Sequence, residues 1–214
     1  LAGTTTISMN QTNVRTLADV PSGAISMQSL QGKSNRVALS YTYSSNTANA
    51  SLNLSAISGY SSGKSDITVT INSGVYLYAT STGSYGLNLS GGTTGDTLTI
   101  VNNGYIMGQG GTGGSNLNSP STGNNNGKVG GPALNLGFGM SSCTINNTNA
   151  SAYIGGGGGG GAAVYYAQTG AGGGGAGGGT GGPTEARPSG SSGGSIGSSG
   201  ANGADGTYGG GAGG

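Results

Sequence analysis

The sequence predicts a mostly β and irregular fold, in which a small base of β-strands is followed by a polyglycine II helix bundle, with essentially no α-helix. Three features predict it. Apolar residues alternate with polar ones in the first half, glycine makes up 52 of the 214 residues and is concentrated in the second half, and residues 194–209 place glycine at every third position without proline. A period of two is typical of half-buried strands, and a period of three suits a helix with three residues per turn.

The strands are expected between residues 37 and 106. Alternating apolar residues mark four stretches: 36–45, 50–60, 65–81 and 86–106. Within the third stretch, the turn residues Asn72, Ser73 and Gly74 separate two alternating runs and predict a β-hairpin. No stretch combines a helical period with capping residues, so no α-helix is expected.

Two parts of the chain, 86–111 and 133–159, share one pattern: Leu-Asn-Leu, then Thr-Ile with a pair of Asn, then Tyr-Ile running into glycine. The offset is 47 positions from Leu87 to Leu134, 45 from Ile100 to Ile145, and 48 from Tyr105 to Tyr153. Self-similarity at such a period indicates a unit that stacks on its copy. The strands are therefore expected to build a small core, while the glycine tails run outward together.

The glycine-rich half needs a reason to be ordered, because glycine loses more backbone entropy on ordering than any other residue. Polyglycine helices packed side by side can exchange backbone N–H and C=O bonds, and a bare glycine face allows the close approach that these bonds need. Residues 194–209 are therefore expected to pack against 155–161 and 172–182. The alternative is a flexible Gly/Ser linker, which explains the composition but not the three-residue register.

The shortage of charged and reactive side chains argues against several classes of function. Charged residues make up 5% of the chain and the net charge is +1, so nucleic acid is not expected as a partner. No apolar run approaches the ~20 residues that cross a bilayer, so membrane insertion is not expected. The chain has no His and one Cys, which predicts no metal site and no cofactor. Residues 59–65 resemble a phosphate-binding loop but have the wrong spacing, and the acidic residues are scattered, so we expect no catalytic residues and no enzyme.

Recognition is expected in the segments that interrupt the glycine runs, namely 115–128, 162–168 and 183–189. Tyr and Arg are enriched in binding hot spots, and loops on a rigid scaffold commonly carry recognition. The candidate binding residues are Asn116, Asn118, Asn124, Asn125, Asn126, Tyr165, Tyr166, Gln168, Thr184, Glu185 and Arg187. For Tyr165 and Tyr166, packing against the edge of the bundle is an equally favoured alternative.

Several of these motifs resemble a known family. NNGYIMGQGGTGG (102–114), GGPALNL (130–136) and AYIGGGGGGGAA (152–163) resemble the receptor-binding tips of tailed-bacteriophage fibres, and especially the small adhesin that caps the long tail fibres of T-even-type phages. The resemblance implies polyglycine helices stacked into a sandwich, with intervening loops that bind a bacterial surface receptor, either an outer-membrane protein or a surface glycan. It also implies a location on the virion, at the tip of the tail fibre and outside the cell.

The upstream stretch VPSGAISMQSLQGKSN (20–35) is similar to a segment that recurs in phage structural proteins. It implies attachment to other tail-fibre subunits, with the chain acting either as a trimer or as a monomer on a trimeric fibre. The candidate attachment residues are Val20, Ile25, Met27 and Leu30. The expected parts are a fibre-attachment segment (1–36), a β-rich base (37–106) and a glycine-rich polyglycine II receptor-binding domain (107–214).

Two other functions stay open at this point. The same bundle could serve as a structural spacer without a receptor, and cell binding by the purified chain separates that function from adhesion. A glycine-rich ice-binding protein would instead present a flat face of small residues and cause thermal hysteresis. Here that face would contain Ser195, Ser198, Ala201 and Ala204.

Overall fold

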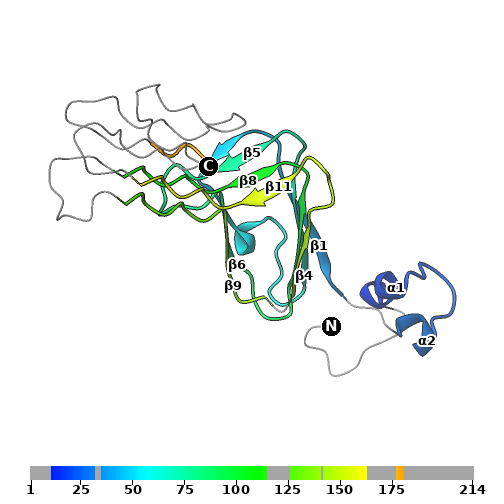
Figure 1. The fold of residues 1–214 in the computed structure, drawn as a ribbon. Coiled ribbons are helices and arrows are strands. Elements are labelled where there is room, and N and C mark those ends of the chain that lie inside the picture. Colours follow the sequence, from blue (N-terminus) through cyan, green and yellow to red (C-terminus); the bar gives the residue numbers. More distant parts are fainter. Residues whose placement is uncertain (1–10, 32–34, 115–125, 141, 163–176, 181–214) are drawn as a thin grey trace, which may run out of the picture. The chain divides into compact units, whose positions relative to one another are not determined.

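The computed structural model describes residues 11–31, 35–114, 126–140, 142–162 and 177–180 (Figure 1). The chain divides into two compact units, 1–37 and 38–214. The three-part division expected from the sequence stays a prediction. No helix in the described part of the chain has the length and apolar character that crossing a membrane requires.

The first unit contains two short helices, α1 (Thr12–Ala18) and α2 (Met27–Leu30). The Arg15 guanidinium donates hydrogen bonds to the carbonyl oxygens of Val20 and Gly23, at 3.3 and 3.0 Å, and so holds the chain that follows α1. Neither helix was expected from the sequence. They have seven and four residues, too few to establish a helical period, and no side chain caps the start of α1.

The second unit is a solenoid in which successive strands pass through three sheets in turn. The first circuit contains β1 (Val37–Tyr43), β2 (Thr47–Ala48) and β3 (Ala50–Asn53), followed by the 3-10 turn η1 (Leu54–Ala56). The second circuit contains β4 (Ser65–Ile71), β5 (Tyr76–Tyr78) and β6 (Leu87–Gly91). The third circuit contains β7 (Thr97–Asn102), β8 (Tyr105–Met107) and β9 (Leu134–Phe138). The fourth circuit contains β10 (Ser142–Asn146) and β11 (Tyr153–Gly155). The sheets are β1-β4-β7-β10, β2-β5-β8-β11 and β3-β6-β9. The mostly β fold class is thereby confirmed.

The sequence repeat corresponds to the pairing register between successive circuits. Leu87 lies opposite Leu134, Ile100 opposite Ile145, and Tyr105 opposite Tyr153, all in parallel pairs. The prediction of a unit that stacks on its copy is confirmed. Stacking equivalent residues lets each apolar side chain meet another of similar shape in the next circuit.

The predicted hairpin over 65–81 is wrong. β4 pairs in parallel with β7, whereas β5 pairs in parallel with β8, so the two strands belong to different sheets. The turn between them, with Gly74 at a φ of 76°, makes a corner of the solenoid. A tight turn between two alternating runs is common to hairpins and solenoid corners, and only the later circuits supply the partner strands.

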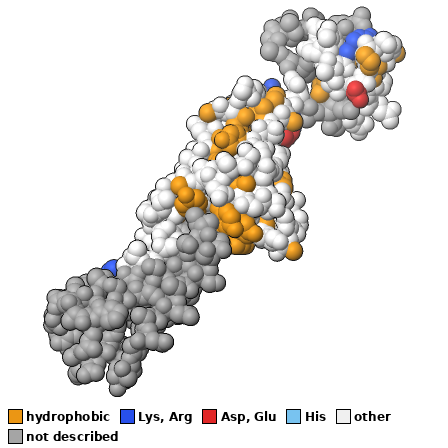
Figure 2. All heavy atoms as spheres, turned by 90° about the horizontal axis from the view of Figure 1, so that it is seen from above, with side chains coloured by type: hydrophobic (Ala, Val, Ile, Leu, Met, Phe, Trp, Pro, Cys, Tyr) orange, Lys and Arg blue, Asp and Glu red, His pale blue; other side chains and the backbone are white. Residues whose placement is uncertain are grey.

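Apolar side chains from all three sheets fill the interior. The following are at most 1% exposed: Ile67, Val69, Ile71, Leu77, Leu87, Leu89, Leu98, Ile100 and Ile106. Along β4, buried and partly exposed positions alternate strictly, as the period of two predicted. On the face of the molecule in Figure 2, the outer surface of this unit is mainly uncharged, with scattered hydrophobic side chains.

A buried carboxylate ties two corners of the solenoid together. Asp96 is 0% exposed, and its oxygens accept hydrogen bonds from the Ser65 N–H (2.9 Å), the Tyr60 hydroxyl (2.7 Å) and both the N–H (2.9 Å) and hydroxyl (3.2 Å) of Thr93. Burial by itself raises the pKa of this carboxyl, but the four hydrogen bonds together lower the pKa below its ordinary value. The stretch 59–65, which resembles a phosphate-binding loop in sequence, thus contributes to a structural corner.

A column of three tyrosines crosses the second sheet, with one tyrosine at the first residue of each of β5, β8 and β11. The rings of Tyr76 and Tyr105 stack with centroids 4.4 Å apart, and those of Tyr105 and Tyr153 are tilted with centroids 5.0 Å apart. The Tyr153 hydroxyl donates to the Met107 sulfur at 3.2 Å. This column stiffens the strands β8 and β11 just before they continue into glycine.

Candidate functional site

Four glycine-rich segments lie side by side beyond the second sheet, and together they form what we call the glycine bundle: 108–114, 126–131, 155–162 and 177–180. Strands β8 and β11 continue directly into the first and third of these (Figure 1). The N–H groups of Gly108, Gly111 and Gly114 donate to carbonyls of the third segment at 2.9, 2.8 and 2.8 Å. The donors, and the acceptors at 155, 158 and 161, are spaced by three residues.

The other backbone groups of segment 108–114 face two further neighbours at the same spacing. The N–H groups of 110 and 113 donate to carbonyls of segment 177–180, at 3.2 and 2.9 Å. The carbonyls of 109 and 112 accept from residues 131 and 128, both at 2.7 Å. Residue numbers increase in the same direction along segments 108–114 and 177–180, so these two segments are parallel. Along segment 126–131 the numbers increase in the opposite direction, so this segment is antiparallel to the others. Successive residues thus serve three different neighbours, as expected for three residues per turn.

Glycine is required at every third position because a neighbouring backbone occupies the place of the side chain. A Cβ atom built on Gly157 would overlap the carbonyl of Gln109, and one on Gly160 would overlap the carbonyl of Thr112. By contrast, a Cβ on Gly159 would lie 3.9 Å from the Lys128 carbonyl oxygen, an ordinary contact. The glycine run 155–161 therefore contains positions that need glycine and others, among them 159, that have room for a methyl group.

Few side chains project from the described bundle, and several are bonded within it. The Gln109 amide donates to the Gly178 carbonyl at 2.7 Å, and the hydroxyls of Thr112 and Thr180 lie 3.4 Å apart. These side chains fasten segment 177–180 to segment 108–114 and are a structural feature that sequence reasoning missed. The signal that could have identified these side chains is a polar residue in a stretch that otherwise consists of glycine.

Three of the segments end together at one end of the bundle. Gly114 donates to the Gly161 carbonyl at 2.8 Å, and the preceding Gly113 donates to the Thr180 carbonyl at 2.9 Å. Segment 126–131 begins at the same end because it runs antiparallel to the other three. We call this the distal end; β8 and β11 enter the bundle at the other.

The chain leaves the described bundle at the distal end, and it re-enters the bundle at Gly177, whose carbonyl accepts from Gly110 towards the other end. The flanking residues are Gly114 and Asn126 on either side of 115–125, Ala162 before 163–176, and Thr180 before 181–214. Of the predicted binding residues, Asn126 is described and is exposed at this end. The other ten lie outside the described residues: Asn116, Asn118, Asn124, Asn125, Tyr165, Tyr166, Gln168, Thr184, Glu185 and Arg187. All ten belong to the three stretches that leave from the distal end.

The predicted attachment residues lie in the first unit. Met27 is 76% exposed, and together with Leu30 it lines a depression on α2 that also involves Gln28 and Gln31. Val20 and Ile25 are half-buried and do not line that depression. The structure therefore brings two of the four predicted residues together.

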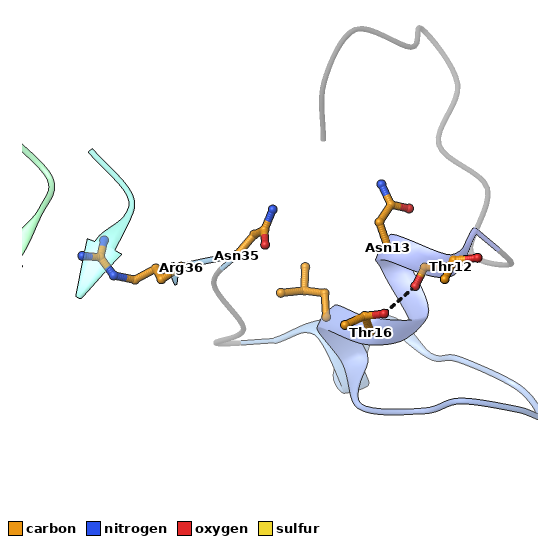
Figure 3. A pocket seen from close by; sticks show the side chains of 6 residues that line it. Thr12, Asn13, Thr16, Asn35 and Arg36 are labelled. Atoms are coloured by element: carbon orange, nitrogen blue, oxygen red, sulfur yellow. Dashed lines mark hydrogen bonds between the residues drawn. The ribbon is translucent and has the colours of Figure 1, made fainter. Parts of the chain in front are cut away.

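A second depression in the first unit is formed mainly by residues with polar side chains (Figure 3). It is lined by Thr12, Asn13, Thr16, Leu17, Asn35 and Arg36. The Thr16 hydroxyl donates to the Thr12 carbonyl at 2.9 Å, so this side chain is engaged within its own helix. Among the described residues there is no group of three His, Cys, Asp or Glu that could hold a metal ion.

Comparison with known proteins decides the family. The family model described as phage tail fibre adhesin Gp38 matches residues 38–214, which is the whole of the second compact unit. The chain belongs to this adhesin family. No curated protein and no solved structure matches the chain. The adhesin is accordingly a component of the virion tail that acts outside the cell at the host surface, which is the context implied by the resemblance in the sequence.

Proposed function

We propose that the adhesin binds a receptor on the bacterial surface, an outer-membrane protein or a surface glycan, through the stretches carried at the distal end of the glycine bundle. In this proposal it acts at the tip of a tail fibre and catalyses no reaction. The observation that carries the proposal is the convergence of Gly114, Asn126, Ala162 and Thr180 at one end of the bundle. A rigid body with few side chains leaves recognition to the segments at its end.

We further propose that the bundle is a polyglycine II assembly. The three-residue spacing of its hydrogen bonds and the overlap of a Cβ at Gly157 and Gly160 with neighbouring carbonyls support this. Residues 194–209, with glycine at every third position, would add a further member; they lie outside the described residues. The ice-binding alternative relies on the same undescribed stretch and has no supporting contact in the described bundle.

Attachment to other tail-fibre subunits is proposed for the first unit, which precedes the family match. The exposed Met27 and the neighbouring Leu30 offer apolar surface for such a contact. Both arrangements, a trimer and a monomer on a trimeric fibre, are compatible with this surface.

The test is direct binding of the purified, fluorescently labelled chain to the bacterium on which the phage grows. We expect saturable binding that competes with phage adsorption. Binding that does not compete, or no binding, would contradict receptor recognition and favour a structural spacer. A non-host strain serves as the control.

Replacing Tyr165 and Tyr166 together with Ala should abolish host-cell binding, because paired aromatic side chains commonly supply the largest share of an interface's energy. The loss should exceed about 100-fold in affinity if both act as hot spots. Tyr165→Phe with Tyr166→Phe keeps the rings and should retain most of the binding. Thermal unfolding of each variant is measured alongside, since a lowered melting temperature in the Ala variant would instead indicate packing against the bundle.

A further inference from the structure

Asparagine is followed directly by glycine at three places in the chain: 103–104, 126–127 and 202–203. In this dipeptide the glycine nitrogen can attack the side-chain amide of the asparagine, because glycine has no side chain to hinder the approach. The third pair lies outside the described residues. The first two pairs are identical in sequence but differ in their surroundings, and the structure therefore predicts different reactivities for them.

The pair at 103–104 is held by hydrogen bonds at a corner of the solenoid, between β7 and β8. The Asn103 N–H donates to the Ile71 carbonyl at 3.0 Å, and the Asn103 carbonyl accepts from the Asn149 side chain at 3.4 Å. The Gly104 N–H, which would be the attacking group, donates instead to the Asn102 side-chain oxygen at 3.2 Å. Gly104 is also buried. Attack on Asn103 would require these bonds to break, so this pair is protected.

The pair at 126–127 has no such protection in the described structure. Asn126 is exposed, and among the described residues neither its side chain nor the Gly127 N–H makes a hydrogen bond. The next hydrogen bond along the segment is donated by the Lys128 N–H to the Thr112 carbonyl at 2.7 Å. No bond between described residues therefore has to break before the Gly127 nitrogen reaches the Asn126 side chain.

The glycine of this pair is imposed by the bundle. A Cβ on Gly127 would overlap the Gly160 carbonyl, and one on Gly130 would overlap the Gly157 carbonyl, so both positions face inward and need glycine. Asn126 follows directly after the polar stretch 115–125. The reactive dipeptide thus arises where an asparagine-rich stretch enters the three-residue glycine register.

We propose that Asn126 is a site of spontaneous deamidation. The Gly127 nitrogen, after losing its proton to hydroxide, forms a bond to the side-chain carbonyl carbon of Asn126. The bond from that carbon to its NH2 group breaks, and the group leaves as ammonia after taking a proton from water. Water then opens the resulting succinimide ring at either of its two carbonyls, which gives aspartate or isoaspartate. The net reaction consumes water, releases ammonia and involves no oxidation or reduction.

Both products change the distal end of the bundle. Each replaces a neutral amide with a carboxylate, in a chain whose net charge is only +1. Isoaspartate also lengthens the backbone by one carbon, immediately before the hydrogen-bonded Lys128. The consequence for binding rests on the proposed function: because recognition is proposed at this end, deamidation of Asn126 should weaken binding to host cells.

The experiment incubates the full chain in mildly alkaline buffer and follows each Asn-Gly pair by mass spectrometry of its own peptide. We expect Asn126 to deamidate at least about 10-fold faster than Asn103, because the protected pair must first break the hydrogen bond of Gly104. In a chemical denaturant the two asparagines should react at similar rates. Asn126→Gln should remain unmodified at this position over the same period, because glutamine closes a larger ring more slowly. Equal rates at Asn103 and Asn126 in the folded chain, or no reaction at Asn126, would overturn the proposal.

Host-cell binding by fresh and incubated samples tests the consequence separately. We expect the unmodified sequence to lose binding in proportion to the deamidated fraction, and Asn126→Gln to keep the binding of its own fresh sample. An equal loss in incubated Asn126→Gln would assign the effect to another asparagine and overturn the role of Asn126 in it. If the fresh chain with the unmodified sequence does not bind cells, the proposed function fails, whereas the mass spectra still decide whether Asn126 deamidates.

Discussion

Gly157→Ala should disrupt the glycine bundle, whereas Gly159→Ala, two residues away, should leave it intact. The new methyl group at 157 would overlap the Gln109 carbonyl, which belongs to the neighbouring backbone and has no rotamer by which to move away. Relieving the overlap means separating segments 108–114 and 155–162 and breaking the hydrogen bond from Gly157 to Gly131. We expect a local destabilisation of about 3 kcal/mol or more, from overpacking plus the lost hydrogen bonds.

Gly159→Ala is the control, and its effect on stability should be opposite in sign to that of Gly157→Ala. At Gly159 the φ angle is outside the left-handed region and a methyl group would have ordinary contacts, so Ala should stabilise by about 0.4–1 kcal/mol through the unfolded chain. Amide hydrogen exchange of Gly108, Gly111 and Gly160 provides the measurement. Fast exchange of these bonded amides in Gly157→Ala alone is the expected result. Equal exchange in both variants would contradict the bonding scheme of the bundle.

The strands and their repeat could be predicted because both depend on local patterns. The alternation in 65–71 fixes which side chains of β4 enter the core, and the shared motif of 86–111 and 133–159 fixes which residues stack. The closing of these strands into a three-sheet solenoid could not be predicted in this way. The hairpin error at 72–74 has this origin, because a corner and a hairpin use the same turn residues and differ only in partners found about 30 residues later.

The site was only partly predictable for a related reason. The third-residue glycine of 194–209 predicted a bundle, but it gave no indication of which glycines in the described segments are required, since Gly157 and Gly159 are identical in sequence terms and differ only in what lies opposite. Asn126 was identified from an island of polar residues. Lys128 belongs to the same island, and Val129 follows it. The exposure of these two side chains could not be predicted from the sequence, because it depends on the inward positions of Gly127 and Gly130.

Asp96→Asn should destabilise the solenoid by about 2–3 kcal/mol at pH 7, the second large effect that we expect. The carboxylate is the acceptor in all four hydrogen bonds. The amide of asparagine would place its own NH2 donors against at least one of these four N–H or O–H donors. Because Asp96 is fully buried, water cannot replace the lost acceptor. Chemical denaturation of the full chain provides the measurement. Asp19→Asn, at an exposed position whose left-handed φ of 58° asparagine tolerates, is the matched control and should change stability little.

The pH dependence distinguishes a lost carboxylate from general damage to the corner. Because the hydrogen bonds hold the pKa of Asp96 in the folded protein below its ordinary value of 3.8, the unfolded chain takes up a proton first as the pH falls. The stabilisation by the carboxylate is therefore fully present above the unfolded pKa and is lost as the pH falls through the folded one. The difference in unfolding free energy between the unmodified chain and Asp96→Asn should be constant from pH 7 to about 5 and should narrow below 3.8. A difference that stays the same at low pH would mean that the substituted amide disturbs the packing of the corner rather than removing a charge-assisted network.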